Sequence, residues 1–424
     1  MRHTLALLAA GLLAGGPLAH AQSVAITNAK VYTMTGPALE RATVLIRDGK
    51  IAAVGEGIAI PAGVRVIDAA GKVVTPGFLD SFTHLGIVEI EAIGETADQS
   101  TNDDRITAAF NVADALNPFS TLIPITRVEG ITRAVVAPQP GASLIAGQGV
   151  LIDLSGEPGE AMIHRNPVAM YAVLGAAGAE KAGGARAAAL LRLREALQDA
   201  RDYAAHRLAF EEARRREYAL SRLDLEALVP VARRQLPLAV HADRAADILA
   251  AIRFARELGI ELVLLGAAEG WLVADEIARA RVPVVINPLQ NLPGFDRLGA
   301  TLENAARLHA AGVTVAFATF EAHNSRNLKQ AAGNAVAYGM PYEEALRAIT
   351  LYPARIWGVA DRYGSIEPGK DGDIVVWSGD PLELTSRAEH VFIRGREVPM
   401  TNRQRELAER YRDLGTPLPP AYRP

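Results

Sequence analysis

The chain has 424 residues with a formal net charge of −4, and half of these residues are hydrophobic. The acidic balance argues against a nucleic-acid-binding protein, which needs a basic surface to replace phosphate counterions. There is no cysteine, so disulfides, thiolate metal sites and cysteine nucleophiles are excluded. Hydroxyl, carboxylate and histidine chemistry remain.

The first 21 residues have the pattern of a secretory signal peptide. Arg2 gives a basic start, an apolar stretch runs from Leu5 to about Leu13, and small residues stand at Ala19 and Ala21. The apolar stretch is shorter than the roughly 20 residues needed to span a bilayer. We predict cleavage near Ala21 and a periplasmic or secreted mature protein that has no membrane partner.

The sequence pattern at both ends of the mature chain predicts β-strands. Residues 24–74 contain short apolar or alternating runs separated by Asp-Gly and Ala-Gly turns, and the segments GSIEPGKDGDIVVW (364–377) and HVFIRGREV (390–398) repeat this style. We therefore predict a noncontiguous β-sandwich domain formed by residues 22–74 and 356–400, followed by a C-terminal tail at 401–424.

The middle of the chain alternates between apolar β-rich runs and helical stretches. Examples are the runs LPLAVHADR (236–244) and IELVLLGAA (260–268), between which lies the helical AADILAAIRFARELG (245–259). Such alternation over a long segment is typical of a parallel sheet closed into a barrel. Residues 75–355 are predicted to form an α/β domain, a (β/α)8 TIM barrel.

Polar residues at the ends of barrel strands are the candidate site residues, because function collects at the C-terminal ends of these strands. Five such strand ends occur, and their residues are Asp80–His84, Val240–Asp243, Leu265–Ala267, Ile286–Asn287 and Ala318–Glu321.

These segments resemble the amidohydrolase superfamily, in its imidazolonepropionase-like branch, and the resemblance covers nearly the whole mature chain. VVTPGFLDSFTHLG (73–86) resembles the first barrel strand, LAVHADRAADI (238–248) the fifth, LVLLGAAEGW (262–271) the sixth and VAFATFEAHNSRNL (315–328) the eighth. The segments ALRAITLYPARIWGV (345–359) and GSIEPGKDGDIVVW resemble the closing helix and the returning strand.

The resemblance implies a site for zinc or another divalent metal. In that family the first strand supplies two histidines, the fifth and sixth supply one each, and an aspartate on the eighth acts on the metal-bound water. Only His84 and His241 match this pattern. The positions that depart from it are Phe82 on the first strand, Gly266 or Ala267 on the sixth and Phe320 on the eighth. A catalytic zinc normally has three protein ligands and a water, so the predicted metal site is incomplete.

Two carboxylates are candidate substitutes for the missing ligands. Alternate residues of a strand share a face, which would place Asp80 beside Phe82 and His84, and Asp243 beside His241. In the alternative interpretation, Asp80 supports the site from behind and Asp243 caps or orients the next helix.

The predicted substrate pocket contains the positions that differ from the family's metal-binding pattern and two residues after the eighth strand. Glu321 follows Phe320 directly, and His323 lies in a loop expected to overlook the barrel mouth. The full set is Phe82, Gly266, Ala267, Phe320, Glu321 and His323.

Two functions fit these observations. The first is an exported amidohydrolase with an incomplete metal site that hydrolyses a carbon-nitrogen bond in a small cyclic amide or an acylated or peptidic amino acid. The second is a catalytically impaired relative that acts as a binding module or as the partner of an active paralogue. Either would have a small-molecule substrate or ligand, and either is compatible with a homo-oligomer.

Overall fold

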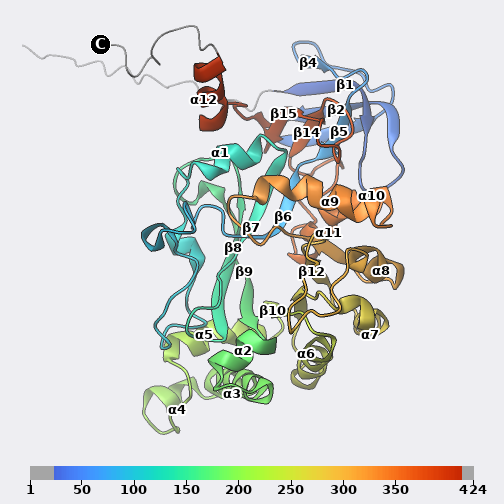
Figure 1. Cartoon of the computed structure of the whole chain (residues 1–424). Coiled ribbons are helices and arrows are strands. Elements are labelled where there is room, and N and C mark those ends of the chain that lie inside the picture. The colour runs from blue at the N-terminus through green and yellow to red at the C-terminus, as the bar shows by residue number, and fades with distance from the viewer. Residues whose placement is uncertain (1–22, 413–424) are drawn as a thin grey trace, which may run out of the picture.

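The computed structural model describes residues 23–412, which form two sheets and the helices around one of them (Figure 1). The predicted signal peptide and the end of the predicted tail lie outside the described residues. None of the helices within 23–412 combines the length and apolar character needed to cross a membrane.

The first sheet takes strands from both ends of the chain. Its order is β16-β15-β14-β5-β1-β2-β3, with β4 paired to β1. The strands are β1 (Val24–Val31), β2 (Leu39–Arg47), β3 (Lys50–Gly55), β4 (Arg65–Asp68), β5 (Val73–Pro76), β14 (Ile374–Trp377), β15 (Ala388–Ile393) and β16 (Arg396–Glu397).

The two segments meet where β5 and β14 pair antiparallel, with Val74 opposite Val376. Alternate residues of the strands, such as Val24 and Ile26, lie in one buried cluster with Val376. The predicted β-rich unit built from both ends of the chain is therefore confirmed, while its exact boundaries stay predictions.

The second sheet is the barrel, and its order along the chain is also its order in space. Its strands are β6 (Phe78–Thr83), β7 (Ile131–Val136), β8 (Ile145–Asp153), β9 (Ile163–Val173), β10 (Leu238–Ala242), β11 (Leu262–Gly266), β12 (Val284–Ile286) and β13 (Val315–Phe317). The sheet closes just beyond β13, where the Phe320 amide donates to the Phe82 carbonyl at 3.0 Å.

The predicted (β/α)8 TIM barrel is confirmed as the fold class, with one departure. Strand β8 runs antiparallel to both β7 and β9, whereas the other neighbours in the barrel are parallel. The connections on either side of β8 are short (137–144 and 154–162). A parallel return needs a crossover of about a dozen residues or more, so these connections impose an antiparallel strand.

Helices surround the barrel, except that the last one, α12, lies at the end of the molecule that carries the first sheet (Figure 1). They are α1 (Leu122–Arg127), α2 (Gly175–Lys181), α3 (Arg186–Ala205), α4 (Arg207–Glu211), α5 (Arg222–Ala232), α6 (Ala245–Leu258), α7 (Ala274–Ala280), α8 (Asn304–Ala310), α9 (Leu328–Ala337), α10 (Tyr342–Ala348), α11 (Leu351–Ile356) and α12 (Arg403–Arg412). Single 3-10 turns are η1 (Gly94–Thr96), η2 (Val112–Ala115), η3 (Gly159–Met162), η4 (Gly270–Val273) and η5 (Ser325–Asn327).

Helix α6 shows how the sequence dictates these elements. Ile248, Ala251, Ala255 and Leu258 recur at helical spacing and are buried, and Gly259 ends the helix in a left-handed conformation with φ of 59°. This helix carries the chain from the end of β10 back to the start of β11, which brings the C-terminal ends of both strands to the same mouth of the barrel.

Candidate functional site

A cavity of about 390 Å³ opens at the C-terminal mouth of the barrel. Its walls come from the ends of β6, β9, β10 and β11, from the residue range 138–140 after β7, from α2 and from the segment after β13. The lining side chains include four predicted site residues, and the central ones are Phe82, His84, Tyr171, His241, Leu265 and Phe320. The structure thus brings the first, fifth and eighth strand candidates together.

Two stacked phenylalanines occupy the centre of this group. The ring centroids of Phe82 and Phe320 are 4.8 Å apart with an angle of 29° between the ring planes. The ring centroids of Phe82 and His84 are 5.4 Å apart, and those of Phe320 and His241 are 6.2 Å apart, each pair in an edge-on arrangement. Each phenylalanine therefore packs against one of the two histidines.

Phe320 sits in an unusual backbone conformation, with φ of 59°. A bulky residue rarely adopts this left-handed region, and it persists only where surrounding contacts hold it. The hydrogen bond from its amide to Phe82 and the ring stack supply these contacts.

His84 is buried, and its Nδ1 donates to the carbonyl oxygen of Ala137 at 2.9 Å. A carbonyl only accepts, so Nδ1 carries the proton and Nε2 holds a lone pair. Burial lowers the pKa of His84, which favours this neutral form. His84 is therefore a polar anchor in a mostly apolar wall.

His241 is more open, and its Nε2 lies 3.3 Å from Oδ2 of Asp243. Burial alone would raise the pKa of Asp243, but the hydrogen bond and charge of His241 hold it below its ordinary value. The other oxygen of Asp243 accepts from the Ala268 amide at 3.2 Å. Asp243 thus links the end of β10 to the loop after β11.

Of the two roles in the alternative interpretation, capping or orienting the next helix, the capping role of Asp243 is wrong. The first amide of α6, at Ala245, donates instead to Glu269, whose second carboxylate oxygen accepts from Gly299 at 2.9 Å. Glu269 is buried and joins three segments around the mouth. Sequence reasoning missed it because its partners lie at distant positions in the chain.

The two sixth-strand candidates lie in different environments. Gly266 faces His241, and a Cβ added there would come within 2.5 Å of Asp243 Oδ1 and 2.8 Å of the His241 ring. Ala267 is fully buried in the core cluster that packs strands against helices, and it does not line the cavity. Gly266 lies beside His241 but does not line the cavity either, so the structure brings neither sixth-strand candidate into the predicted pocket.

Asp80 does not share a face with Phe82 and His84, contrary to the expectation from strand alternation. The pairing of β6 with β7 shifts register between Asp80 and Thr83, and this irregularity breaks the alternation. The buried carboxylate accepts from the Phe82 amide at 3.2 Å and from the Thr319 amide at 3.1 Å. Asp80 therefore links β6 to the segment that follows β13 and does not line the cavity.

The two remaining candidates lie at the rim. Glu321 and His323 are exposed, and neither lines the cavity. Glu321 accepts a hydrogen bond from the Asn324 side chain, and His323 lies 4.0 Å from Glu91.

The described side chains do not match the needs of a catalytic metal. Within residues 23–412, no three His, Asp or Glu side chains gather in a metal-binding arrangement. Phe82 and Phe320, which the resemblance pairs with a first-strand and an eighth-strand ligand, carry phenyl rings, and these have no lone pair to donate.

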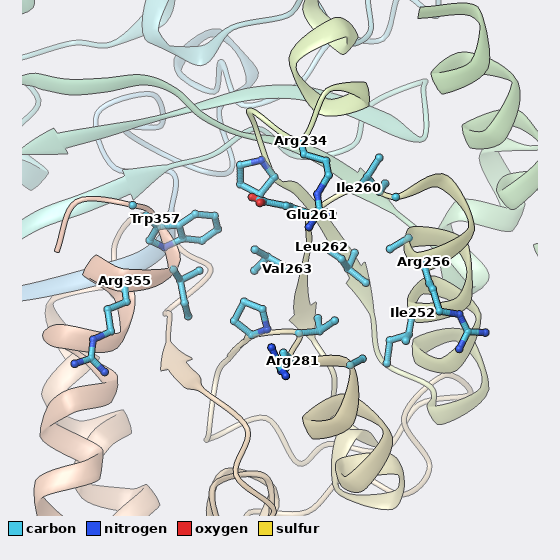
Figure 2. A pocket seen from close by; sticks show the side chains of 18 of the residues that line it. Arg234, Ile252, Arg256, Ile260, Glu261, Leu262, Val263, Arg281, Arg355 and Trp357 are labelled. Atoms are coloured by element: carbon cyan, nitrogen blue, oxygen red, sulfur yellow. The ribbon is translucent and has the colours of Figure 1, made fainter. Parts of the chain in front are cut away.

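A larger cavity of about 1020 Å³ lies at the opposite end of the barrel (Figure 2). It is bounded by the residues that precede β10, β11 and β12 and by the end of α11. Arginines dominate its polar lining. No sequence pattern predicted it, because its lining residues come from separate connections.

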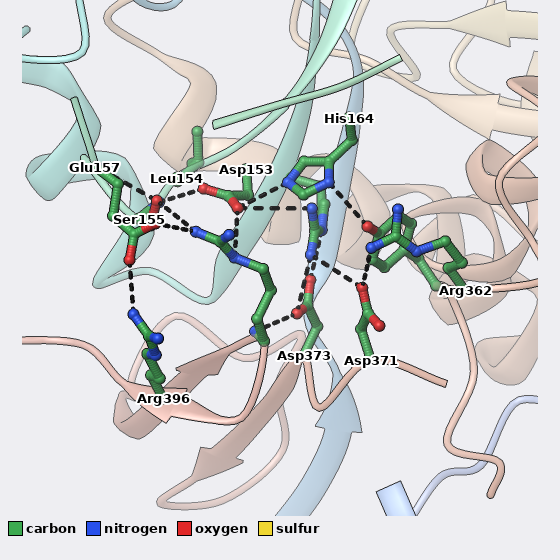
Figure 3. A network of polar contacts seen from close by, with 12 residues as sticks. Asp153, Leu154, Ser155, Glu157, His164, Arg362, Asp371, Asp373 and Arg396 are labelled. Carbon is green, nitrogen blue, oxygen red and sulfur yellow. Dashed lines mark hydrogen bonds and ion pairs between the residues drawn. The ribbon is translucent and has the colours of Figure 1, made fainter. Parts of the chain in front are cut away.

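A buried polar network joins the barrel to the first sheet (Figure 3). Arg133 of β7 is 1% exposed, and its Nε donates to Asp373 at 2.6 Å. Asp153 of β8 accepts from His164 Nε2 at 2.8 Å, and the other nitrogen of His164 lies 3.1 Å from the Tyr363 hydroxyl. Its centre, at Arg133, Asp153 and Asp373, is closed to solvent and holds the two sheets together, whereas Arg362 and Arg396 at its edges are exposed.

Comparisons with known proteins identify the family. The model of the amidohydrolase family matches residues 161–401. A solved structure of an amidohydrolase from Thermotoga maritima MSB8 is 31% identical, with a TM-score of 0.80 over 89% of this chain and 99% of that one. The chain belongs to the amidohydrolase family. The assignment to the amidohydrolase superfamily that was made from the sequence is confirmed.

Other members of the amidohydrolase family extend the comparison. An imidazolonepropionase from Polaromonas sp. is 26% identical over 407 residues, which cover 85% of this chain and 87% of that protein. Amidohydrolase tasK from Hapsidospora irregularis is 25% identical over 369 residues, or 79% of this chain. The chain spans only 37% of the length of tasK.

Proposed function

We propose that this amidohydrolase-family chain is exported and binds a small molecule at the barrel mouth without metal-assisted hydrolysis, either alone or as the partner of an active paralogue. The observation that carries the proposal is the stack of Phe82 on Phe320 between the positions of His84 and His241.

Metal-assisted hydrolysis makes demands that this stack does not meet. Lowering the pKa of a bound water to near 7 requires a firmly held ion with three protein ligands. The proton transfers that follow require a carboxylate within reach of the water. Phenyl rings at positions 82 and 320 supply neither function, which supports an incomplete metal site.

The cavity itself suits a small ligand. Its volume of about 390 Å³ falls in the ordinary range for small-molecule sites, which are mostly apolar with a few polar anchors. Tyr171, Leu265 and the phenylalanines give the apolar wall, and His84 and Gln139 are among the polar groups at its edge.

The metal content of the mature protein tests this proposal. We expect well below one equivalent of zinc per chain by elemental analysis and no turnover of cyclic amides or N-acyl amino acids. EDTA should leave the melting temperature unchanged to within about 1 °C, because a tightly bound ion would stabilise the native state by mass action. One equivalent of zinc together with turnover would overturn the proposal.

A second candidate, hydrolysis of a carbon-nitrogen bond with a substitute metal site, is favoured by one observation. Asp243 lies 3.3 Å from Nε2 of His241, so a histidine and a carboxylate already face one another at the mouth. Under this candidate, Asp243→Asn would reduce both zinc retention and turnover. Under the favoured proposal, the zinc content of this variant equals that of the parent.

Export is tested separately. We expect the mature chain to begin near Gln22 and to be recovered outside the cytoplasm, because a basic start, an apolar stretch and a small-residue site direct secretion. Cell fractionation with N-terminal sequencing measures this. A variant with Leu7→Arg and Leu8→Arg should keep the leader and stay in the cytoplasm. Recovery of an uncleaved cytoplasmic parent would contradict the prediction.

A further inference from the structure

The cavity at the N-terminal end of the barrel carries a strong excess of positive charge. Seven arginines and two glutamates line it, although the chain as a whole has a net charge of −4. The arginines are Arg165, Arg234, Arg253, Arg256, Arg279, Arg281 and Arg355. The glutamates are Glu261 and Glu276.

Two of these arginines have partners within the chain. Arg165 donates to the carbonyl oxygens of Trp357 and Gly358, both at 3.0 Å. Arg279 pairs with Glu276 at 3.1 Å. For the other five, no ion pair or side-chain hydrogen bond to a residue within 23–412 is present. Five arginines without an ion pair to the residues within 23–412 therefore line one concavity, and the two glutamates leave its lining with a net positive charge.

These arginines come from separate parts of the fold. Figure 2 shows Arg234, Arg256, Arg281 and Arg355 around the cavity. They lie after α5, in the last turn of α6, after α7 and in the last turn of α11. Tertiary structure alone gathers them.

A simpler explanation is that each arginine complements the negative end of its own helix, where cations are favourable. This effect accounts for an arginine at any one helix end. It does not explain why arginine occupies positions 234 and 281, where the backbone is left-handed with φ of 61° and 55°. Glycine adopts this conformation without strain. The simpler explanation also predicts only a loss of stability when the arginines are replaced, so the two explanations are distinguishable.

We propose that this cavity binds a small polyanion that carries two or more phosphate groups. The planar guanidinium fork binds phosphate oxygens in a bidentate manner, and several forks around one space select for more than one phosphate. The apolar part of the wall, with Ile252, Pro283 and the edge of Trp357, has room for an organic group. This site lies at the opposite end of the barrel from the cavity that contains His84, and it does not depend on the function of that cavity.

Titration calorimetry with inorganic tripolyphosphate tests the site in the full mature protein. In roughly 0.15 M salt, where exposed charges are screened beyond about 8 Å, we expect saturable binding with one site per chain. The double change Arg234→Gln and Arg281→Gln should weaken binding about a hundredfold, since each lost charge-assisted contact is worth about tenfold or more.

A control variant removes the same charge elsewhere. Arg192→Gln with Arg214→Gln changes two exposed arginines on α3 and after α4 that do not line the cavity, and its affinity should match that of the parent. Melting temperatures of both variants check that each is folded. The proposal is overturned if the parent shows no saturable binding at this salt concentration. It is also overturned if both double variants bind as the parent does.

Discussion

Replacing Arg133 by methionine is expected to lower the free energy of unfolding by about 3–5 kcal/mol. The guanidinium is almost fully buried, with Asp373 at 2.6 Å and Asp153 at 3.8 Å. Removing it leaves these carboxylates buried without their cation, which costs far more than the loss of an exposed pair. Chemical denaturation of parent and variant, monitored by circular dichroism, measures the difference.

An exposed arginine provides the control for this change. Arg214 pairs with Glu212 at the surface, with side chains 68% and 56% exposed, so Arg214→Met should change the free energy of unfolding by about 1 kcal/mol or less. Arg133→Lys keeps the charge but loses the planar fork, and it should fall between the two. Equal stability of Arg133→Met and Arg214→Met would show that the buried network contributes nothing.

The second large effect concerns Asp80 and pH. Burial raises the pKa of Asp80 to about 7, even though several hydrogen bonds favour its charged form. The folded state then holds this proton more tightly than the unfolded state, whose ordinary value is near 3.8. Stability from this group is present below pH 3.8 and is lost as pH rises to about 7, by up to about 1.4 kcal/mol per pH unit.

The variant Asp80→Asn removes this titration. Its unfolding free energy, measured by urea denaturation from pH 4 to pH 7, should lack the decline attributed to Asp80, so the difference from the parent should grow with pH. Asp103→Asn is the control, because hydrogen bonds from Arg105 lower the pKa of exposed Asp103 to about 2, outside this range. Parallel curves for the parent and Asp80→Asn would contradict the raised pKa.

The sequence predicted those parts of the site that depend on local pattern. An apolar run ended by a polar residue located the strand ends, and these positions place Phe82, His84, His241 and Phe320 around one cavity. The strands at both ends of the chain could also be predicted from the sequence, because turn residues separate short alternating runs.

The remaining features depend on contacts between distant segments. The register shift in β6 that turns Asp80 away from the cavity has no signature in the sequence. The arginine-lined cavity combines side chains from different connections. Taken alone, each connection has the sequence pattern of an ordinary helix end. The antiparallel direction of β8 follows from short connections, and alternation of apolar runs did not reveal it.

The structure also limits any attempt to build a metal site at the cavity by substitution. The changes Phe82→His and Phe320→Asp replace stacked rings at the cavity, but Gly266→His places a Cβ against Asp243 and His241 at a φ of 80°. Such a backbone position is strained for any side chain. A histidine ligand at position 266 is therefore opposed by backbone geometry as well as by the neighbouring side chains.

The shared sheet imposes an order on folding. Strand β5 is paired by a strand that is made near the end of synthesis, and the Trp377 indole bonds to Thr75 across 302 positions. Until β14 emerges, one edge of β5 stays open, and open edges invite pairing with other chains. The free edge of β5 must therefore wait for almost the entire polypeptide, and a chain truncated before residue 374 is expected to aggregate.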